Sequence, residues 1–259
     1  LDLGVGGMLV LTNVATARIM DGQSFEVTIL IAIAAIVAAV VIHAFVGWIV
    51  TASRVPDLVS TLGALYFYQG LALAILPNPG GGTSEGFRWI FTGSDVGTGS
   101  NPWPASVMIA IPILVVAWWL GKTRSGLSLY AVGSDKTAAY LSGIRAARTK
   151  IVAFGLGGAF AAMAGLSTTA IAGSGNANTV GGNMTLNSVA AIVLGGVALT
   201  GGIGSVIAVV PAGLILFFLS PILTAMGVDP NRAQIIQGVL IVVVMMIAGL
   251  IEWRRQRRV

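Results

Sequence analysis

The sequence has no cysteine, a single histidine and few charged residues of either sign. The absence of cysteine excludes disulfide frameworks, thiolate chemistry and cysteine metal sites. Charged residues make up 9% of the 259 residues, whereas a soluble domain carries about 25%. Hydrophobic residues reach 56% and the mean hydropathy is +0.93. These values exclude an ordinary globular surface and indicate that lipid surrounds most of the chain.

Apolar stretches that are long enough to form membrane helices run through the whole chain. About 20 apolar residues cross a bilayer as a helix. A shorter stretch over residues 186–197 is typical of a re-entrant or broken helix. We therefore predict an all-α, polytopic membrane helical bundle that forms one transmembrane domain over residues 1–259. The predicted spans are Glu26–Arg54, Leu58–Leu76, Pro104–Leu120, Ile151–Ala172, Ser205–Met226 and Ala233–Ile251, with Leu3–Met20 as a further span or the tail of one.

The basic residues fall mainly on one side of the predicted membrane. Of the 14 Lys and Arg residues, three (Arg18, Arg88 and Arg232) lie on the opposite side from the other eleven. Because cytoplasmic loops carry the excess of Lys and Arg, we predict that the larger set and the C-terminus are cytoplasmic. The net charge of +5 then reflects basic residues gathered on one side of the membrane, and it does not indicate binding to nucleic acid. The larger set is Arg54, Lys122, Arg124, Lys136, Arg145, Arg148, Lys150, Arg254, Arg255, Arg257 and Arg258.

Motifs that would give the chain its own chemistry fail on spacing. The "GKT" at 121–123 resembles the end of a phosphate-binding loop, but that loop requires glycine where Val116 stands. No set of His, Asp and Glu has metal-ligand spacing. The spans also lack the residues for a catalytic triad of a serine, His43 and a carboxylate. We therefore expect no catalytic residue, no metal, no nucleotide site in this chain, and a structural role for His43.

Between the end residues of the predicted spans, His43 is the only Asp, Glu or His. Proton-coupled carriers keep such residues in the membrane, at about 2.5–3.5 kcal/mol per charge at the helix centre. If the chain moves a solute, the driving force is then expected to come from outside the bilayer. Neutral polar groups are candidates for a solute pathway, although Ser and Thr often bond their own helix backbone instead. The candidates are Asn13, Thr61, Tyr68, Gln69, Asn187 and Ser188.

A short polar stretch, "SDKTAAYLSGI" at 134–144, lies between two long apolar runs. Ser134 or Asp135 can cap the start of a helix, and Gly143 can close it in the left-handed conformation. About two turns are too short to be stable in water alone. The helix must therefore dock, either on its own bundle or in the groove of a partner; a loop that merely forms one turn is the alternative. The expected apolar side is Ala138, Leu141, Ile144 and Tyr140.

Small residues recur every four positions in "GLGGAFAAMAGLS". Gly157, Ala161 and Gly165 form one such series, and Gly158 and Ala162 form another. Small residues at this spacing allow helix backbones to approach each other closely in lipid. The pattern predicts tight packing of this span and needs no further function.

Four stretches carry a resemblance to a known family. "RSGLSLYAVGSDKTAAYLSGI" closely resembles the cytoplasmic coupling loop of the ribose/xylose-type permeases of bacterial sugar ABC importers. "LDLGVGG", "SRVPDLVSTLGALYFYQGLAL" and "AAIVLGGVALTGGIGS" are similar to three further family motifs, in the same order. Gly4, Gln69, Val197 and Ala198 depart from the usual residues, which leaves the particular sugar open.

The resemblance covers essentially the whole chain and implies the ABC importer permease fold. It also implies that the chain is N-terminally truncated, lacking the first helix or two. The coupling loop is expected at 122–150, with Gly133 and Gly143 as hinges around a short coupling helix. The residues expected to couple to an ATPase are Gly133, Ser134, Asp135, Ala138, Ala139, Leu141, Ser142 and Gly143.

The resemblance further implies partners. An ABC ATPase subunit would hold the ATP and Mg²⁺, so that this chain needs no cofactor. An external sugar-binding protein would meet Arg88 and Arg232, with Arg18 as a weaker candidate. A second permease copy would complete a homodimer or a heterodimer in the bacterial inner membrane.

The expected function is therefore ATP-driven import of a neutral sugar, a pentose, hexose or related polyol. A related permease for branched-chain amino acids or for a sugar-like quorum signal is an alternative, and so, from a different class, is a passive channel or a membrane scaffold. Ala139→Arg is expected to leave folding intact and to abolish substrate-stimulated ATP hydrolysis.

Overall fold

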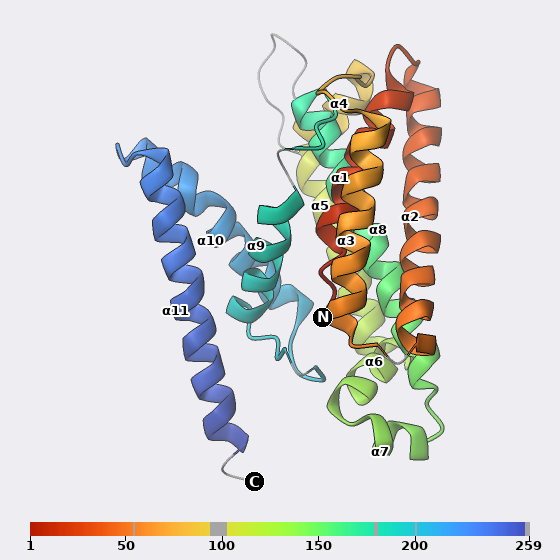
Figure 1. Ribbon diagram of the computed structural model, residues 1–259, viewed down its shortest axis with the longest axis vertical. Helices are drawn as coiled ribbons and strands as arrows, with labels where there is room; N and C mark the ends of the chain where they lie inside the picture. The colour runs from red at the N-terminus through yellow and green to blue at the C-terminus, as the bar shows by residue number, and fades with distance from the viewer. Residues whose placement is uncertain (54, 94–102, 179–180, 200, 257–259) are drawn as a thin grey trace. The chain divides into compact units, whose positions relative to one another are not determined.

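The computed structural model describes residues 1–53, 55–93, 103–178, 181–199 and 201–256 (Figure 1). Within these ranges the chain forms eleven α-helices and one isolated β-bridge, between Gly80 and Gly175. The all-α prediction is confirmed. The helices are α1 (Val5–Met20), α2 (Phe25–Ser53), α3 (Asp57–Ile75), α4 (Glu85–Thr92), α5 (Trp103–Lys122), α6 (Arg124–Ser134), α7 (Lys136–Leu141), α8 (Ala146–Ala172), α9 (Gly181–Leu194), α10 (Val206–Ala225) and α11 (Pro230–Gln256).

Several of these helices have the length and composition of membrane spans. Among the described residues five do so: α2, α3, α8, α10 and the Pro230–Ile247 part of α11. Helices α5 and α6, bent by 73° at their junction, would make a sixth if counted as one span. Helix α1 and Met184–Leu194 of α9 are apolar but shorter. The predicted polytopic bundle is thus confirmed, including the short apolar stretch near residue 190.

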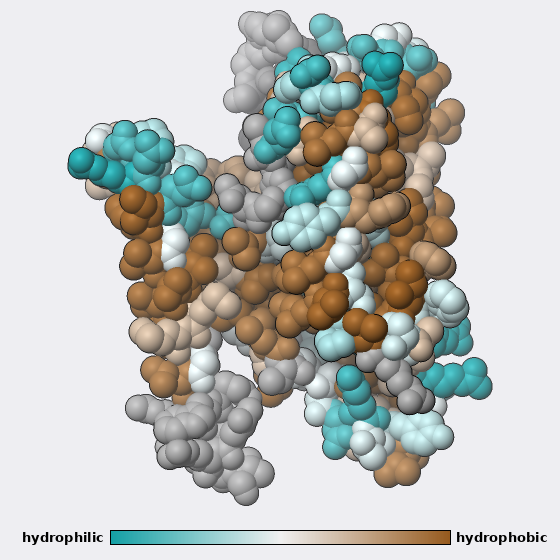
Figure 2. Space-filling model, in the orientation of Figure 1, coloured by the Kyte–Doolittle hydropathy of each residue, from teal (hydrophilic) through white to brown (hydrophobic). Residues whose placement is uncertain are grey.

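The apolar surface of the span α2 faces outward. Leu30, Val37 and Val41 of α2 are all exposed, and Figure 2 shows apolar side chains covering the side of this helix. In water this surface would be a large exposed apolar patch. A hydrocarbon environment accounts for it, because a membrane helix presents its apolar side chains to lipid.

The chain divides into two compact units. One comprises 1–114 and 145–185, and the other comprises 115–144 and 186–259. The single transmembrane domain over 1–259 stays a prediction.

Helix α8 is the centre of the first unit and packs against both α1 and α2. Gly165 meets α1 so closely that a Cβ on it would lie 2.5 Å from the Leu9 carbonyl oxygen. A Cβ on Gly158 would lie 2.5 Å from the carbonyl oxygen of Ala39 in α2. Ala161 and Ala162, between these glycines, are buried. The predicted close packing through small residues is therefore confirmed.

The two ends of the first unit carry different contacts. At one end Lys150 Nζ lies 2.5 Å from Asp57 Oδ1, which ties the start of α8 to the start of α3. At the other end Arg88 of α4 donates to the Ala170 carbonyl near the end of α8. Lys150 and Arg88 thus lie at opposite ends, as the charge count requires, although the orientation itself stays a prediction. Arg54, Arg257 and Arg258 lie outside the described residues, and of Arg254 and Arg255 only the backbone is described.

In the second unit α10 and α11 pack together, and Leu216 of α10 forms a buried cluster with Ala190 and Ala191 of α9. The predicted coupling loop at 122–150 also contains more helix than the sequence indicated. Helix α6 was not expected, since two glycines and three serines lower its helix propensity. Thr123 nucleates it by accepting a hydrogen bond from Gly126 N. The last five residues, 146–150, belong to α8.

Candidate functional site

Helices α6 and α7 share one junction residue, Asp135. Its backbone N–H donates to the Ala131 carbonyl and so ends α6. Its carboxylate accepts hydrogen bonds from Thr137 N at 2.7 Å and Ala138 N at 3.0 Å and so begins α7. Of the two predicted caps, Asp135 is therefore the one used. Because a single residue joins them, the short helix α7 is fixed to the end of α6.

The other end of α7 closes as the sequence predicts. Gly143 has a φ of +80°, and its N–H donates to the Tyr140 carbonyl. The Ile144 N–H donates to the Ala139 carbonyl at 3.0 Å. A residue with a side chain is disfavoured at such a φ, so Gly143 is required for the chain to leave α7 in this direction. The left-handed glycine is confirmed.

One apolar side chain of α7 is buried and three are exposed, and two of the exposed ones are large. Ala139 is 3% exposed, whereas Tyr140 is 74% and Leu141 is 80% exposed. We call the Tyr140–Leu141 pair the α7 knob. The burial of Ala139 argues against the expectation that Ala139→Arg leaves folding intact, because arginine does not fit at a buried position without displacing its neighbours. The outcome of that substitution stays a prediction. Among the other predicted coupling residues, Gly133 and Ser134 end α6, while Ala138 and Ser142 are exposed on α7.

Asn13, a predicted pathway residue, is 1% exposed and every polar atom of its amide is bonded. Its Nδ2 donates to Thr169 Oγ1 at 2.9 Å and to the Ser174 carbonyl. Its Oδ1 accepts from Asn176 N at 3.0 Å. These bonds join α1 to α8 and to the segment that follows α8. Packing of the first unit therefore accounts for this amide without a solute.

Thr61, Tyr68 and Gln69 all lie on α3 but in different surroundings. Thr61 is buried, and its hydroxyl donates to the Asp57 carbonyl on its own helix. This is the local bond expected of a threonine within a helix. Tyr68 is buried, whereas Gln69 is partly exposed. Thr61 and Tyr68 are seven positions apart and share the buried face of α3, whereas Gln69 lies beside that face. The role of the three residues in a pathway stays a prediction.

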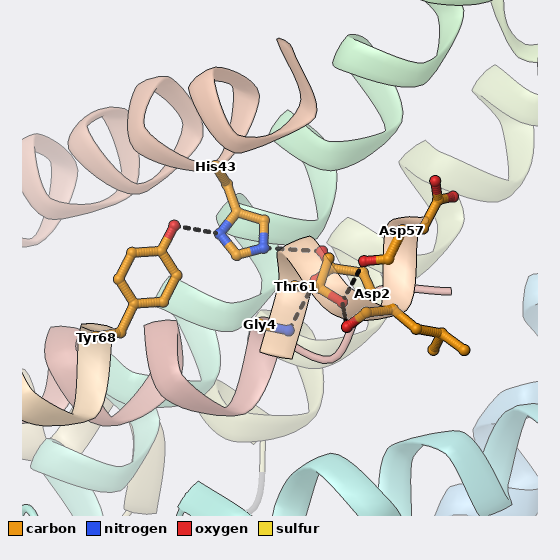
Figure 3. A network of polar contacts seen from close by, with 7 residues as sticks. Asp2, Gly4, His43, Asp57, Thr61 and Tyr68 are labelled. Atoms are coloured by element: carbon orange, nitrogen blue, oxygen red, sulfur yellow. Dashed lines mark hydrogen bonds and ion pairs between the residues drawn. The ribbon is translucent and has the colours of Figure 1, made fainter. Parts of the chain in front are cut away.

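A polar chain that the sequence did not predict links Tyr68, His43 and Asp2 (Figure 3). His43 Nε2 lies 2.8 Å from Asp2 Oδ2, and the Tyr68 hydroxyl lies 3.4 Å from His43 Nδ1. Asp2 Oδ1 also accepts a hydrogen bond from Gly4 N. The imidazole is fully buried, so a partner for it was expected. Asp2 was missed because 41 positions separate it from His43; the only local signal was a carboxylate inside an apolar run.

In the second unit, Asn187 and Ser188 are partly exposed on α9. Gln237 of α11 donates to Asn187 Oδ1 at 3.3 Å and to the Leu216 carbonyl of α10 at 3.4 Å. One glutamine thus bridges three helices at the depth of Asn187. We call the side chains of Asn187 and Gln237 the polar cluster at Asn187.

The two cations predicted to meet a binding protein differ in their contacts. The Arg88 Nε donates to the Ala170 carbonyl at 3.1 Å, next to Gly173, which caps the C-terminus of α8. A cation there satisfies a free carbonyl and opposes the helix dipole. The side chain of Arg232 near the start of α11 is exposed. Docking through either residue stays a prediction.

Within the part of the chain that the structure describes, no group of three or more His, Asp or Glu lies close enough together to hold a metal ion. The Asp2–His43 pair has a tyrosine as its third member, and Asp2 also accepts from the backbone of Gly4. The arrangement accordingly resembles a structural link between helices more than a catalytic group.

Comparisons with known proteins agree with this picture. The model of the family described as "Branched-chain amino acid transport system / permease component" matches residues 1–245. The ribose import permease protein RbsC of Escherichia coli K12 is 33% identical over 99% of this chain and 78% of its own length. The autoinducer 2 import system permease protein LsrC of Enterobacter sp. 638 is 33% identical, and that of Yersinia pestis Pestoides F is 30% identical, each over 87% of this chain and 63% of its own length. No solved structure gives a significant match.

Proposed function

Since the chain belongs to the family of branched-chain amino acid transport system permease components, we propose that it is the permease subunit of an ABC importer for a neutral sugar. The observation that carries this proposal is α7, a separately capped helix with a solvent-exposed knob. A six-residue helix gains stability only by docking. Its own bundle buries Ala139 and leaves the α7 knob outside, so the knob is available to a partner.

The partner we propose for the α7 knob is an ABC ATPase subunit, which would hold the ATP and Mg²⁺. Tyr140 and Leu141 are both large, apolar and exposed on a helix whose two ends are fixed. Burying one such side chain stabilises a complex by about 1.5–3 kcal/mol. If the groove of the ATPase moves, the docked α7 would move with it and would pull α6 along, because Asp135 joins the two helices.

A sugar is the substrate class we propose because of the relatives and the charge distribution. The ribose import permease aligns over 99% of the chain. The candidate pathway residues of the chain are neutral hydrogen-bonding groups, which suit hydroxyls better than a zwitterion. The autoinducer 2 permeases cover a smaller part of the chain and make a sugar-like signal the second candidate. A branched-chain amino acid, named in the family description, is the third.

We further propose that the permease works as a pair of permease chains in the bacterial inner membrane, with the C-terminus cytoplasmic. An external sugar-binding protein would deliver the substrate. Arg232, whose side chain is exposed, is the stronger of the two candidate contacts for acidic residues on that protein, because the guanidinium of Arg88 is already engaged by α8.

Uptake by the complete system tests the substrate and the energy source together. The full-length permease, its ATPase and its binding protein would be reconstituted in liposomes and offered radiolabelled ribose, xylose, leucine and autoinducer 2. We expect ATP-dependent accumulation of a pentose, and none of leucine. If only leucine or only autoinducer 2 were taken up with ATP, that compound would replace the neutral sugar as the proposed substrate. Equilibration of sugar without ATP and without the ATPase would identify a passive channel.

A pair of variants tests the α7 knob. Leu141→Asp places a charge where the ATPase groove is proposed, and Leu141→Met keeps an apolar side chain of similar volume. We expect Leu141→Asp to lose co-purification of the ATPase, and Leu141→Met to keep it, with the same size-exclusion profile for both permeases. Full ATPase binding and uptake by Leu141→Asp would contradict the proposed role of α7.

A further inference from the structure

The end of α6 makes a backbone contact with the turn that links α9 to α10, and no side chain can enter it. A Cβ placed on Gly133 would lie 2.4 Å from the backbone nitrogen of Gly202. A Cβ placed on Gly202 would lie 2.3 Å from Ser134 Oγ and 2.5 Å from Ser134 N. All three residues belong to the same compact unit. Gly133 thus makes a tight contact inside a helix, and its role as a hinge stays a prediction.

The turn is itself held in one conformation. Gly201, Gly202 and Gly204 have φ values of +96°, +75° and +138°, which residues with a side chain rarely adopt. The Ala198 N–H donates to the Ile203 carbonyl at 3.0 Å, which closes the turn on itself. The Tyr130 hydroxyl of α6 donates to the Gly204 carbonyl at 3.2 Å. Helix α6 is therefore attached to the turn at two places.

The helices before and after the turn also approach each other closely. A Cβ on Gly195, just after α9, would lie 2.8 Å from the Cα of Val209 in α10. Helix α9 carries Asn187, and Gln237 of α11 is bonded to it. On the other side of the contact, Asp135 fixes α7 to α6. A continuous set of rigid contacts thus runs from the α7 knob to the polar cluster at Asn187.

We propose that the Gly133–Gly202 contact is the link that passes movement of α7 to α9 and α10. This inference rests on the proposed function, in which an ATPase moves α7. Contacts between backbones transmit displacement with little loss, because no flexible side chain lies between them. Gly133 and Gly202 are then positioning residues: they touch neither the ATPase nor the solute, yet they determine whether hydrolysis moves the solute.

Gly133→Ala tests the link, with Gly121→Ala as its matched control. Gly121 lies in α5 of the same unit, and a Cβ on it meets nothing within 4 Å. In the full complex with its ATPase and binding protein, we expect Gly133→Ala to keep ATPase co-purification and basal hydrolysis. The number of solute molecules imported per ATP hydrolysed should fall well below the wild-type value. Gly121→Ala should match the wild type.

The outcomes are distinguishable. Wild-type uptake per ATP in Gly133→Ala overturns the link, and so does a proportional loss of co-purification, hydrolysis and uptake, because that pattern indicates a purely structural glycine. If the wild-type complex shows no ATP-dependent uptake at all, the proposed function fails instead.

A second measurement decides the question even if Gly133→Ala does not fold. The chain has no cysteine, so spin labels can be attached at Thr137→Cys in α7 and Leu186→Cys in α9, both exposed positions. If the contact transmits movement, the distance between these labels stays the same with and without trapped ATP in a complex that imports solute. A distance that changes with nucleotide in a fully coupled complex overturns the proposal.

Discussion

Two glycines on α8, two turns apart, should respond with opposite sign to the same substitution. Gly165 is in contact with α1: an added Cβ would lie 2.5 Å from Leu9 O, 2.8 Å from Thr12 Cβ and 3.0 Å from Asn13 N. Gly157 belongs to the same four-residue series, but its nearest neighbours would lie at 3.6 and 3.8 Å. The second set is ordinary van der Waals contact, so alanine fits at 157 without movement.

The magnitudes follow from two terms. Replacing glycine by alanine within a helix gains about 1 kcal/mol in helix propensity, and this gain applies at both positions. At Gly165, α1 and α8 must separate by roughly 1 Å to restore normal contact, and such overpacking costs about 1–3 kcal/mol. The separation also stretches the 2.9 Å bond between Asn13 and Thr169, which is worth about 0.5–1.5 kcal/mol. We expect Gly165→Ala to be destabilised by about 1–3 kcal/mol and Gly157→Ala to be stabilised by up to about 1 kcal/mol.

The assay is unfolding of the full-length permease in mixed micelles, as SDS is added and tryptophan fluorescence is recorded. The free energy of unfolding is compared among the wild type and the two variants in the same detergent. The reasoning fails if both variants are equally stable, because then the close approach of α1 and α8 at Gly165 does not limit packing.

Three further predictions use the same unfolding assay. Removing the imidazole in His43→Ala leaves the Asp2 carboxylate with only a backbone partner, so we expect a loss of about 3 kcal/mol; a wild-type midpoint would mean that Asp2 and His43 are not paired. Arg88→Ala uncaps α8 and should lower stability by about 0.3–1 kcal/mol, with faster amide exchange at the end of that helix; unchanged exchange would contradict the cap. Lys150→Met removes a half-exposed ion pair with Asp57, and its effect should stay below about 1 kcal/mol and vanish in high salt; a loss that salt does not reduce would point to packing instead.

Local features of the fold were predictable from the sequence. The spans could be located from the lengths of the apolar runs, because a helix that crosses the bilayer needs about 20 consecutive apolar residues. The boundaries of α7 were predictable for a similar reason, since Asp135 and Gly143 act on backbone groups a few positions away. The close packing of Gly165 was predictable from spacing alone.

Contacts between distant residues were not predictable in this way. Asp2 and His43 are 41 positions apart, and Tyr130 and Gly204 are 74 apart. Nothing in the local pattern of either member indicates the other, because the pairing arises only when the helices pack. Helix α6 was missed for another reason: its glycines and serines lower its propensity, and tertiary contact at Gly126, where a Cβ would lie 2.2 Å from the Trp119 carbonyl oxygen, requires glycine.

The candidate site was only partly predictable. Sequence reasoning predicted the two ends of α7, yet it expected Ala139→Arg to leave folding intact although the structure buries Ala139. A helix of six residues is too short to show a hydrophobic periodicity, so the sequence does not indicate which of its alanines packs inward. Likewise Asn13 was selected for its polarity, and polarity alone does not distinguish an amide that binds a solute from one that joins two helices.

The α7 knob also bears on how the importer is assembled in the cell. If α7 docks on an ATPase as proposed, a permease chain without its ATPase would leave Tyr140 and Leu141 uncovered. Chaperones and proteases act on chains that are not fully folded or assembled. On that proposal, docking would protect the permease, and permease made in excess of its partner would be removed.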